Sequence, residues 1–236
     1  PVLRIGNPSR VNDKMLSFTY ERRFEGHPAY TELWGIRKSI REMGNRMRKS
    51  SYSEREAARS RINHLRERAT ELEIQINEDL FSGARVIAST LVSSNHRILT
   101  GRRFTTLFID EAAQALEAAC WIAIRKADRV IFAGDHCQLP PTIKCIEAAR
   151  NGLEQTLMEK VAANKQETVS LLKVQYRMHQ SIMQFSSEWF YQGELQAAPE
   201  VTNRGILDLD LPMSWIDTSE MEFHEEFVGE SFGRIN

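Results

Sequence analysis

The chain has 236 residues, of which 42% are hydrophobic and 27% charged, and its formal net charge is −1. This composition is typical of a globular protein of one large domain or one and a half, and no apolar run is long enough to span a bilayer. The near-neutral charge does not indicate a nucleic-acid-binding protein, although such binding depends on local patches rather than on the total.

The cysteines and histidines argue against a zinc site and against a secreted protein. The three cysteines lack paired CxxC spacing, and no two of the six histidines are four residues apart. We therefore expect reduced thiols, no structural zinc and a cytoplasmic location, with the nucleus an alternative in a eukaryote. The N-terminal residues also lack the layout of a signal peptide.

Residues 1–29 open with a short apolar strand at Val2–Ile5 and continue as a polar stretch. Residues 30–83 have a helical composition, with two apolar series broken by Ser50–Ser53. Their members recur every three or four residues: Leu33, Ile36, Ile40, Met43 and Met47, then Ala58, Ile62, Leu65, Ala69, Leu72 and Ile76. Each series predicts a narrow apolar seam on a helix, and together they predict an antiparallel helical hairpin.

The predicted hairpin carries an excess of positive charge. Residues 37–68 contain eleven basic and four acidic side chains. The favoured interpretation is a solvated outer face, because helical hairpins commonly carry such charge. The alternative is a basic arm that lies near a nucleic-acid backbone.

From residue 84 onward, apolar strands alternate with helical segments, which predicts an α/β fold with a parallel sheet. The expected strands are 85–90, 106–110, 129–134, 170–174 and 212–217. The expected helices are 116–123, 152–162 and 180–190.

Two carboxylates follow the second of these strands, where Leu107-Phe108-Ile109 runs into Asp110-Glu111. The carboxyl edge of a parallel sheet is where α/β proteins bind ligands. In a nucleotide-hydrolysing site the first acid can hold Mg²⁺ and the second can deprotonate the attacking water. Alone, such a pair is more often a solvated loop or a helix cap.

Polar residues also follow the next two strands. Gly134 permits a tight exit from 129–134, Asp135 lies at the same predicted edge, and Gln138 can reach a phosphate or the attacking water. Arg177 follows 170–174, and arginine suits the charge that develops on a transferred phosphoryl group.

The sequences DEAAQ, GDHCQLPPT and QYRMH occur in this order, each after a predicted strand. Together they resemble motifs II, III and IV of the superfamily 1 helicases, in the up-frameshift branch, and VIASTLVSSNH at 86–96 is similar to motif Ic. The resemblance covers residues 1–10 and 84–195 and is looser through the hairpin. It implies a RecA-like parallel sheet flanked by helices, with the helical hairpin at 30–83 as an insertion.

The resemblance also implies roles for individual residues. Asp110 would coordinate Mg²⁺, Glu111 would be the catalytic base, Gln138 would sense the γ-phosphate of ATP, and Arg177 would be an arginine finger. Gly134 and Asp135 would line the nucleotide cleft. The residues expected on the backbone of single-stranded nucleic acid are Thr90, Ser93, Ser94, Asn95, His96, Pro140, Pro141 and Thr142.

One motif of the family is missing, because no G-x-x-x-x-G-K-[ST] phosphate-binding loop occurs in the chain. In the family this loop lies N-terminal to the region that corresponds to residue 1 of this chain. Residues 1–29 and 84–195 would then be most of the first RecA-like domain, and 196–236 a linker and the start of the second. We expect the isolated chain to be inactive as an ATPase and to expose a sheet edge.

Three functions remain open at this point. The resemblance implies an ATP-driven motor that moves 5′ to 3′ on single-stranded DNA or RNA and separates duplexes. A nucleoprotein-remodelling ATPase would carry the same motifs. A degenerate, non-catalytic motor domain could instead act as a binding scaffold. Such a domain would not need the four polar residues of the nucleotide site, so their presence argues against this alternative: Asp110, Glu111, Gln138 and Arg177.

Overall fold

The fold is known from a computed structural model, which describes residues 1–47, 52–205, 212–220, 226–228 and 233–235. The chain divides into two compact units, Pro1–Asn164 and Lys165–Asn236. No helix in the described residues has the length and apolar character needed to cross a membrane.

The first unit begins with a pair of parallel strands that are distant in sequence. Strand β1 (Val2–Ile5) pairs with β2 (Val86–Ser89), so that Leu3 lies opposite Ile87. Leu3 and Ile5 are buried against Phe81 and Leu99. Short helices connect β1 to the rest of the unit: η1 (Pro8–Arg10), η2 (Asp13–Phe18) and α1 (Tyr20–Glu25).

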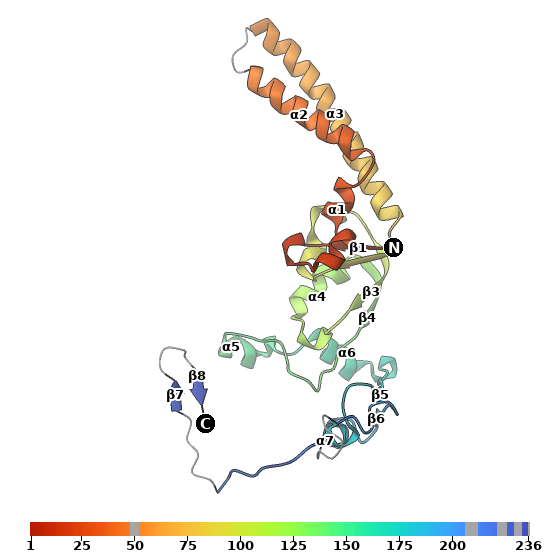
Figure 1. The fold of residues 1–236 in the computed structure, drawn as a ribbon, viewed down its shortest axis with the longest axis vertical. Helices are drawn as coiled ribbons and strands as arrows, with labels where there is room; N and C mark the ends of the chain where they lie inside the picture. The colour runs from red at the N-terminus through yellow and green to blue at the C-terminus, as the bar shows by residue number, and fades with distance from the viewer. Residues whose placement is uncertain (48–51, 206–211, 221–225, 229–232, 236) are drawn as a thin grey trace. The chain divides into compact units, whose positions relative to one another are not determined.

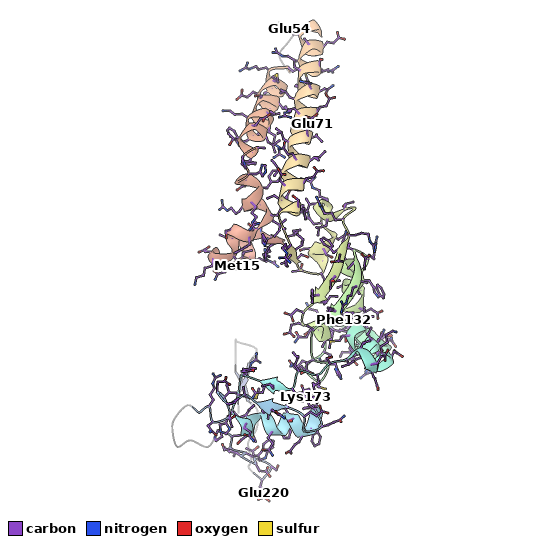
Figure 2. The ribbon with its side chains drawn as sticks, turned by 90° about the vertical axis from the view of Figure 1, so that its right-hand side faces the viewer. Met15, Glu54, Glu71, Phe132, Lys173 and Glu220 are labelled. Carbon is purple, nitrogen blue, oxygen red and sulfur yellow. The ribbon has the colours of Figure 1, made fainter. Side chains whose placement is uncertain are left out.

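Helices α2 (Tyr30–Met47) and α3 (Tyr52–Ser82) lie side by side and run in opposite directions (Figures 1 and 2). The predicted seam is the face on which they meet, with Leu33, Ala69, Leu72 and Ile76 buried in one cluster. The seam residues Ile40 and Met43 of α2 are only half-buried. The seam is therefore most completely buried between Leu33 and Ile76, although Ile62 farther along α3 is buried as well.

Ion pairs cross the flank of these helices. Arg37 Nη2 lies 2.6 Å from Glu73 Oε1, and Arg68 Nη2 lies 3.0 Å from Glu32 Oε1. All four side chains are more than a third exposed, so solvent screens the pairs and each adds little to stability. The pairs nevertheless neutralise two of the eleven basic residues that the sequence placed here.

A second parallel pair carries the predicted motifs. Strand β3 (Phe104–Ile109) pairs with β4 (Ala127–Phe132), and helix α4 (Glu117–Ile124) forms the crossover between them. Short helices η3 (Val92–Asn95), η4 (Arg97–Leu99) and η5 (Ala112–Gln114) flank β3. After β4 come α5 (Ile146–Ala148), the π-helical turn η6 (Ala149–Leu153) and α6 (Leu157–Asn164).

The second unit has little regular structure apart from one helix. Helix α7 (Gln180–Phe190) has the bounds that the sequence predicted. Strand β5 (Val174–Gln175) pairs in parallel with β6 (Gln196–Ala197), and β7 (Glu226–Val228) pairs antiparallel with β8 (Gly233–Ile235). The helix η7 (Gln166–Thr168) begins the unit.

Three details of the predicted fold are wrong. The described strands form four two-stranded sheets rather than one parallel sheet, and the free side of β1 makes an isolated parallel bridge between Arg4 and Thr19 instead. The predicted strand at 170–174 is reduced to its last residue: among the described strands β6 pairs with this segment, and the pairing begins at Val174 and leaves Leu172 87% exposed. Residues 212–217 are not a strand either, and Trp215 is likewise 87% exposed.

The buried seam of α3 gives a first prediction. Leu72→Ala removes a fully buried side chain, and we expect it to lower the free energy of unfolding by about 2–5 kcal/mol. Thermal melting of the 236-residue chain followed by circular dichroism measures the change. Ile74→Ala on the same helix is the control, since Ile74 is 52% exposed and its loss should change stability by about 0.5 kcal/mol or less. Equal losses in the two variants would contradict this packing.

Candidate nucleotide and nucleic-acid site

The loops that follow β3 and β4 are joined by backbone hydrogen bonds. The N–H of Ala133 donates to the carbonyl of Ile109 at 2.8 Å, and the N–H of Ala112 donates to the carbonyl of Ala133 at 2.9 Å. These bonds continue the register in which Ile109 lies opposite Phe132, the β4 residue labelled in Figure 2. The turn that carries Asp110 and Glu111 is thereby fixed against the turn that begins at Gly134.

The two carboxylates lie at the carboxyl end of β3, and both side chains are exposed. Asp110 Oδ1 accepts a hydrogen bond from the backbone N–H of Glu111 at 3.1 Å. Glu111 has φ 51° and ψ 39°, a left-handed conformation that a non-glycine residue adopts at some cost in free energy. The backbone therefore holds Glu111 in an unfavourable conformation at the position where the sequence predicted the catalytic base.

Gly134 is required by this close approach of the two loops. A Cβ atom at this position would lie 2.9 Å from the backbone nitrogen of Ala112 and 3.0 Å from that of Ala113. It would also lie 3.1 Å from the sulfur of Met158 in α6. No side chain larger than hydrogen fits here without moving the turn that follows Asp110 and Glu111.

Helix α6 packs against the turn that follows β3. Leu157 packs with Ile109, Ala112 and Cys120 in one buried cluster. Lys160 Nζ donates to Glu117 Oε2 at 2.7 Å, and Trp121 Nε1 donates to Glu117 Oε1 at 3.1 Å. The hydrogen bond from Lys160, and secondly that from Trp121, lower the pKa of Glu117 below its usual value. Glu117 thus stays charged and ties the crossover helix to α6.

The loop after Gly134 is ordered by Asp135, whose two carboxylate oxygens accept different bonds. Oδ1 accepts the backbone N–H of Cys137 at 3.0 Å, and Oδ2 accepts Nε2 of Gln138 at 2.8 Å. The structure therefore brings Asp135 and Gln138 together. The predicted residues that follow differ in exposure: Pro140 and Thr142 are exposed, whereas Pro141 is buried.

The predicted nucleic-acid loop after β2 is folded on itself. Thr90 Oγ1 donates to Ser93 Oγ at 2.8 Å and accepts the backbone N–H of Ser93 at 3.2 Å. His96 accepts the N–H of Ile98 at its Nδ1, 3.4 Å away, while Asn95 is exposed. Ser94 is only 7% exposed and its hydroxyl donates to the carbonyl of Leu91, so it supports the loop in this structure.

A groove lies beside this loop that the sequence analysis did not predict. Because β1 and β2 are parallel, the loops after both strands meet at one edge. The groove has a volume of about 330 Å³ and is lined by Ile5, Gly6, Asn7, Pro8, Glu21, Ser93, His96 and Ile98. The signal that could have revealed it is the Gly6-Asn7-Pro8 turn, which directly follows a buried strand.

Arg177 lies in the second unit and is exposed there. Its turn is held by Gln175, a residue that the sequence analysis did not select. Gln175 Oε1 accepts the N–H of Arg177 at 2.8 Å and that of Met178 at 2.9 Å, and its Nε2 donates to the carbonyl of Met178 at 2.8 Å. Nη1 of Arg204 donates to the carbonyl of Arg177 at 2.9 Å. The backbone around Arg177 is therefore fixed by two side chains.

Comparison with known proteins gives matches along almost the whole chain. Residues 1–145 match one AAA domain family and residues 153–232 match another. The rat DNA-binding protein SMUBP-2 is 33% identical over 95% of this chain and 25% of its own length. The DNA polymerase alpha-associated DNA helicase A of Saccharomyces cerevisiae is 32% identical over 95% of this chain and 37% of its own.

A third relative is similar over a shorter region. The regulator of nonsense transcripts 1 homolog of Arabidopsis thaliana is 39% identical over 61% of this chain and 11% of its own length. The matched part of the chain therefore spans between about a tenth and two fifths of the length of these relatives.

The close approach at Gly134 gives a second prediction. Gly134→Ala is expected to lower the free energy of unfolding by about 1–3 kcal/mol, because the methyl group overlaps two backbone nitrogens. Chemical denaturation of the chain measures the change. Gly44→Ala in α2 is the control, since nothing lies within 4 Å of its added Cβ, and a helical alanine should stabilise by up to about 1 kcal/mol. A neutral Gly134→Ala would contradict the geometry.

The hydrogen bonds of Gln175 give a third prediction. In Gln175→Ala the amides of Arg177 and Met178 lose their acceptor, so we expect their hydrogen exchange to accelerate roughly tenfold or more, as expected for losing a bond of about 1.5 kcal/mol. Gln175→Glu keeps the acceptor oxygens and loses only the donor, so it should exchange at an intermediate rate. Equal exchange in all three proteins, measured by NMR, would show that Gln175 does not hold the turn.

Proposed function

The chain belongs to the superfamily 1B helicases, matching two AAA domain families in turn, and from this premise we propose that it is part of an ATP-dependent helicase motor. The motor would couple ATP hydrolysis to movement on single-stranded nucleic acid. Two of the relatives carry names that refer to DNA binding or a DNA helicase, and a third refers to nonsense transcripts.

The observation that carries this proposal is the joining of the two loops after β3 and β4. A γ-phosphate, its Mg²⁺ and an attacking water need carboxylate and amide groups at one edge of a sheet. Asp110 and Glu111 are fixed on one loop and Gln138 on the other, and backbone bonds connect the loops. Gly134 makes that connection sterically feasible, and Asp135 orders the loop that presents Gln138.

Each side chain can be given a role in hydrolysis. Asp110 would hold Mg²⁺, whose preference for hard oxygen ligands its exposed carboxylate fits; the metal would neutralise charge on the phosphates of ATP. Glu111 would take the proton of the attacking water. Gln138 would leave Asp135 to contact the γ-phosphate. For Arg177, in the second unit, the family resemblance implies the role of an arginine finger.

Single-stranded nucleic acid would lie along the edge formed by β1 and β2. Thr90, Ser93, Asn95 and His96 offer hydroxyl, amide and imidazole groups there, and the groove brings Asn7 beside two of them. Pro140 and Thr142 would extend the path. Such contacts bind the sugar–phosphate backbone without reading the bases, so affinity should tolerate changes of sequence.

The remaining features of the motor are inferred from the family. Residues 1–29 and 84–195 would belong to the first RecA-like domain, with 30–83 inserted in it, and 196–236 would lead to the second. Movement would run 5′ to 3′ as the two domains close on ATP and open after hydrolysis. The isolated chain, which contains no G-x-x-x-x-G-K-[ST] loop, should not hydrolyse ATP.

The fourth prediction tests the catalytic assignment. In a natural protein that contains this chain together with a phosphate-binding loop, Glu111→Gln should lower the turnover number for ATP by about two to four orders of magnitude, because the general base is lost. Hydrolysis is measured with and without single-stranded DNA and RNA, and stimulation by one polymer identifies the substrate. Asp128→Asn, a change at an exposed surface ion pair, is the control and should leave turnover unchanged.

Other outcomes separate the alternatives. A folded protein with an intact phosphate-binding loop but no hydrolysis would overturn the motor and leave a binding scaffold. Hydrolysis that depends on Glu111 without strand separation in a duplex assay would instead indicate a nucleoprotein-remodelling ATPase.

A further inference from the structure

Three consecutive residues of the loop after β4 place different metal-binding atoms close together. A carboxylate oxygen of Asp135, a ring nitrogen of His136 and the sulfur of Cys137 all lie within 4.8 Å of one another. Within the described ranges, this is the one group of three or more His, Cys, Asp or Glu side chains that meets this spacing. The cysteine and histidine spacings gave no indication of it, because the three ligands are adjacent in sequence.

The chemistry of the donors selects the kind of metal. Nitrogen, sulfur and oxygen together suit Zn²⁺ and similar borderline cations, whereas Mg²⁺ and Ca²⁺ take oxygen ligands. Two donors bound tetrahedrally at about 2.0 and 2.3 Å would lie about 3.5 Å apart. Side-chain rotations that close a gap of about 1 Å would therefore complete three of four ligand positions and leave the fourth for water.

The loop is already ordered around one of these ligands. Asp135 Oδ1 accepts the backbone N–H of Cys137 at 3.0 Å, which keeps the carboxylate and the cysteine on the same side of the turn. Coordination of the Cys137 sulfur as a thiolate should release the thiol proton when a cation binds.

We propose that Asp135, His136 and Cys137 form a binding site for a thiophilic divalent cation of the zinc class. Binding would also act on Gln138, whose Nε2 donates to Asp135 Oδ2 at 2.8 Å. A metal that draws the carboxylate into its coordination sphere competes with this amide, so occupancy loosens Gln138. The binding itself does not depend on the proposed motor function. If Gln138 does contact the γ-phosphate, occupancy of the site also gives the motor a metal-sensitive control point.

Cobalt is the probe for this site, because four-coordinate Co²⁺ with a thiolate ligand absorbs in the visible and near ultraviolet. We expect one equivalent of Co²⁺ to give these bands with the reduced 236-residue chain, and Zn²⁺ to abolish them. Excess Mg²⁺ should leave them unchanged, since its preferred ligands are oxygens. Absence of the bands at one equivalent would overturn the proposal.

Matched variants assign the ligands. Cys137→Ser should abolish the thiolate band, whereas Cys145→Ser, which removes an exposed thiol in the same region, should keep it. His136→Ala should weaken Zn²⁺ binding roughly tenfold or more. Gln138→Ala should bind Zn²⁺ at least as tightly as the parent, because the competing amide is gone, and it tests the coupling without removing a ligand.

Two results would contradict the metal site or its coupling to Gln138. A band that survives Cys137→Ser and disappears in Cys145→Ser would show that an exposed thiol, and not this loop, holds the metal. Binding weakened by Gln138→Ala would overturn the competition between the metal and the amide. Circular dichroism of each variant shows whether a lost band reflects a lost ligand or an unfolded chain.

Discussion

The candidate site depends on one close approach, that of the turn after β3 to the turn after β4. Two hydrogen bonds, from Ala133 to Ile109 and from Ala112 to Ala133, extend the parallel pairing beyond the ends of the strands. The approach leaves no room for a side chain at residue 134. It also turns the backbone at Glu111 into the left-handed region, which the buried Ala112 and Ala113 on its far side hold in place. Strain at Glu111 and the glycine at 134 are thus two consequences of the same contact.

Two segments that are distant in sequence, α4 and α6, pack around this contact. Leu157 closes the apolar side of the turn, and Lys160 of the same helix neutralises Glu117 at the start of α4. Both residues lie more than forty positions after the carboxylates. A change in α6 can therefore alter the geometry at Asp110 without touching it, because α6 and the turn share one buried cluster. The ion pair is half-exposed and adds little stability, so its effect is chiefly on orientation.

The sequence predicted the helices, whose burial follows local periodicity. It failed for strands, whose formation depends on a partner strand. The seam of α2 and α3 could be read directly, since burial of Leu33, Leu72 and Ile76 follows a repeat of three and four residues. The segment 170–174 has an equally apolar pattern, yet only Val174 is a strand, because its neighbour β6 is two residues long. Edge pairing is a property of two segments. For the same reason the sequence could not reveal that β1 and β3 lie in separate two-stranded sheets.

Among the candidate site residues, the sequence identified groups that carry charge and missed those that hold others in place. Asp110, Glu111 and Gln138 stand out because their chemistry matches a reaction. Gln175 does not, although three hydrogen bonds make it the support of the Arg177 turn. Ser94 was selected because its motif resembles a backbone-binding loop, and the structure adds that its side chain is buried in that loop. A positioning side chain is recognised by the hydrogen bonds it makes in the folded state. The role of a polar residue in a motif likewise depends on its exposure, and the motif alone does not give that exposure. The two hydrogen bonds that Asp135 accepts differ in the same way. The bond from the N–H of Cys137 shapes the loop, whereas the bond from Gln138 restrains a side chain that would have to leave Asp135 to contact a nucleotide.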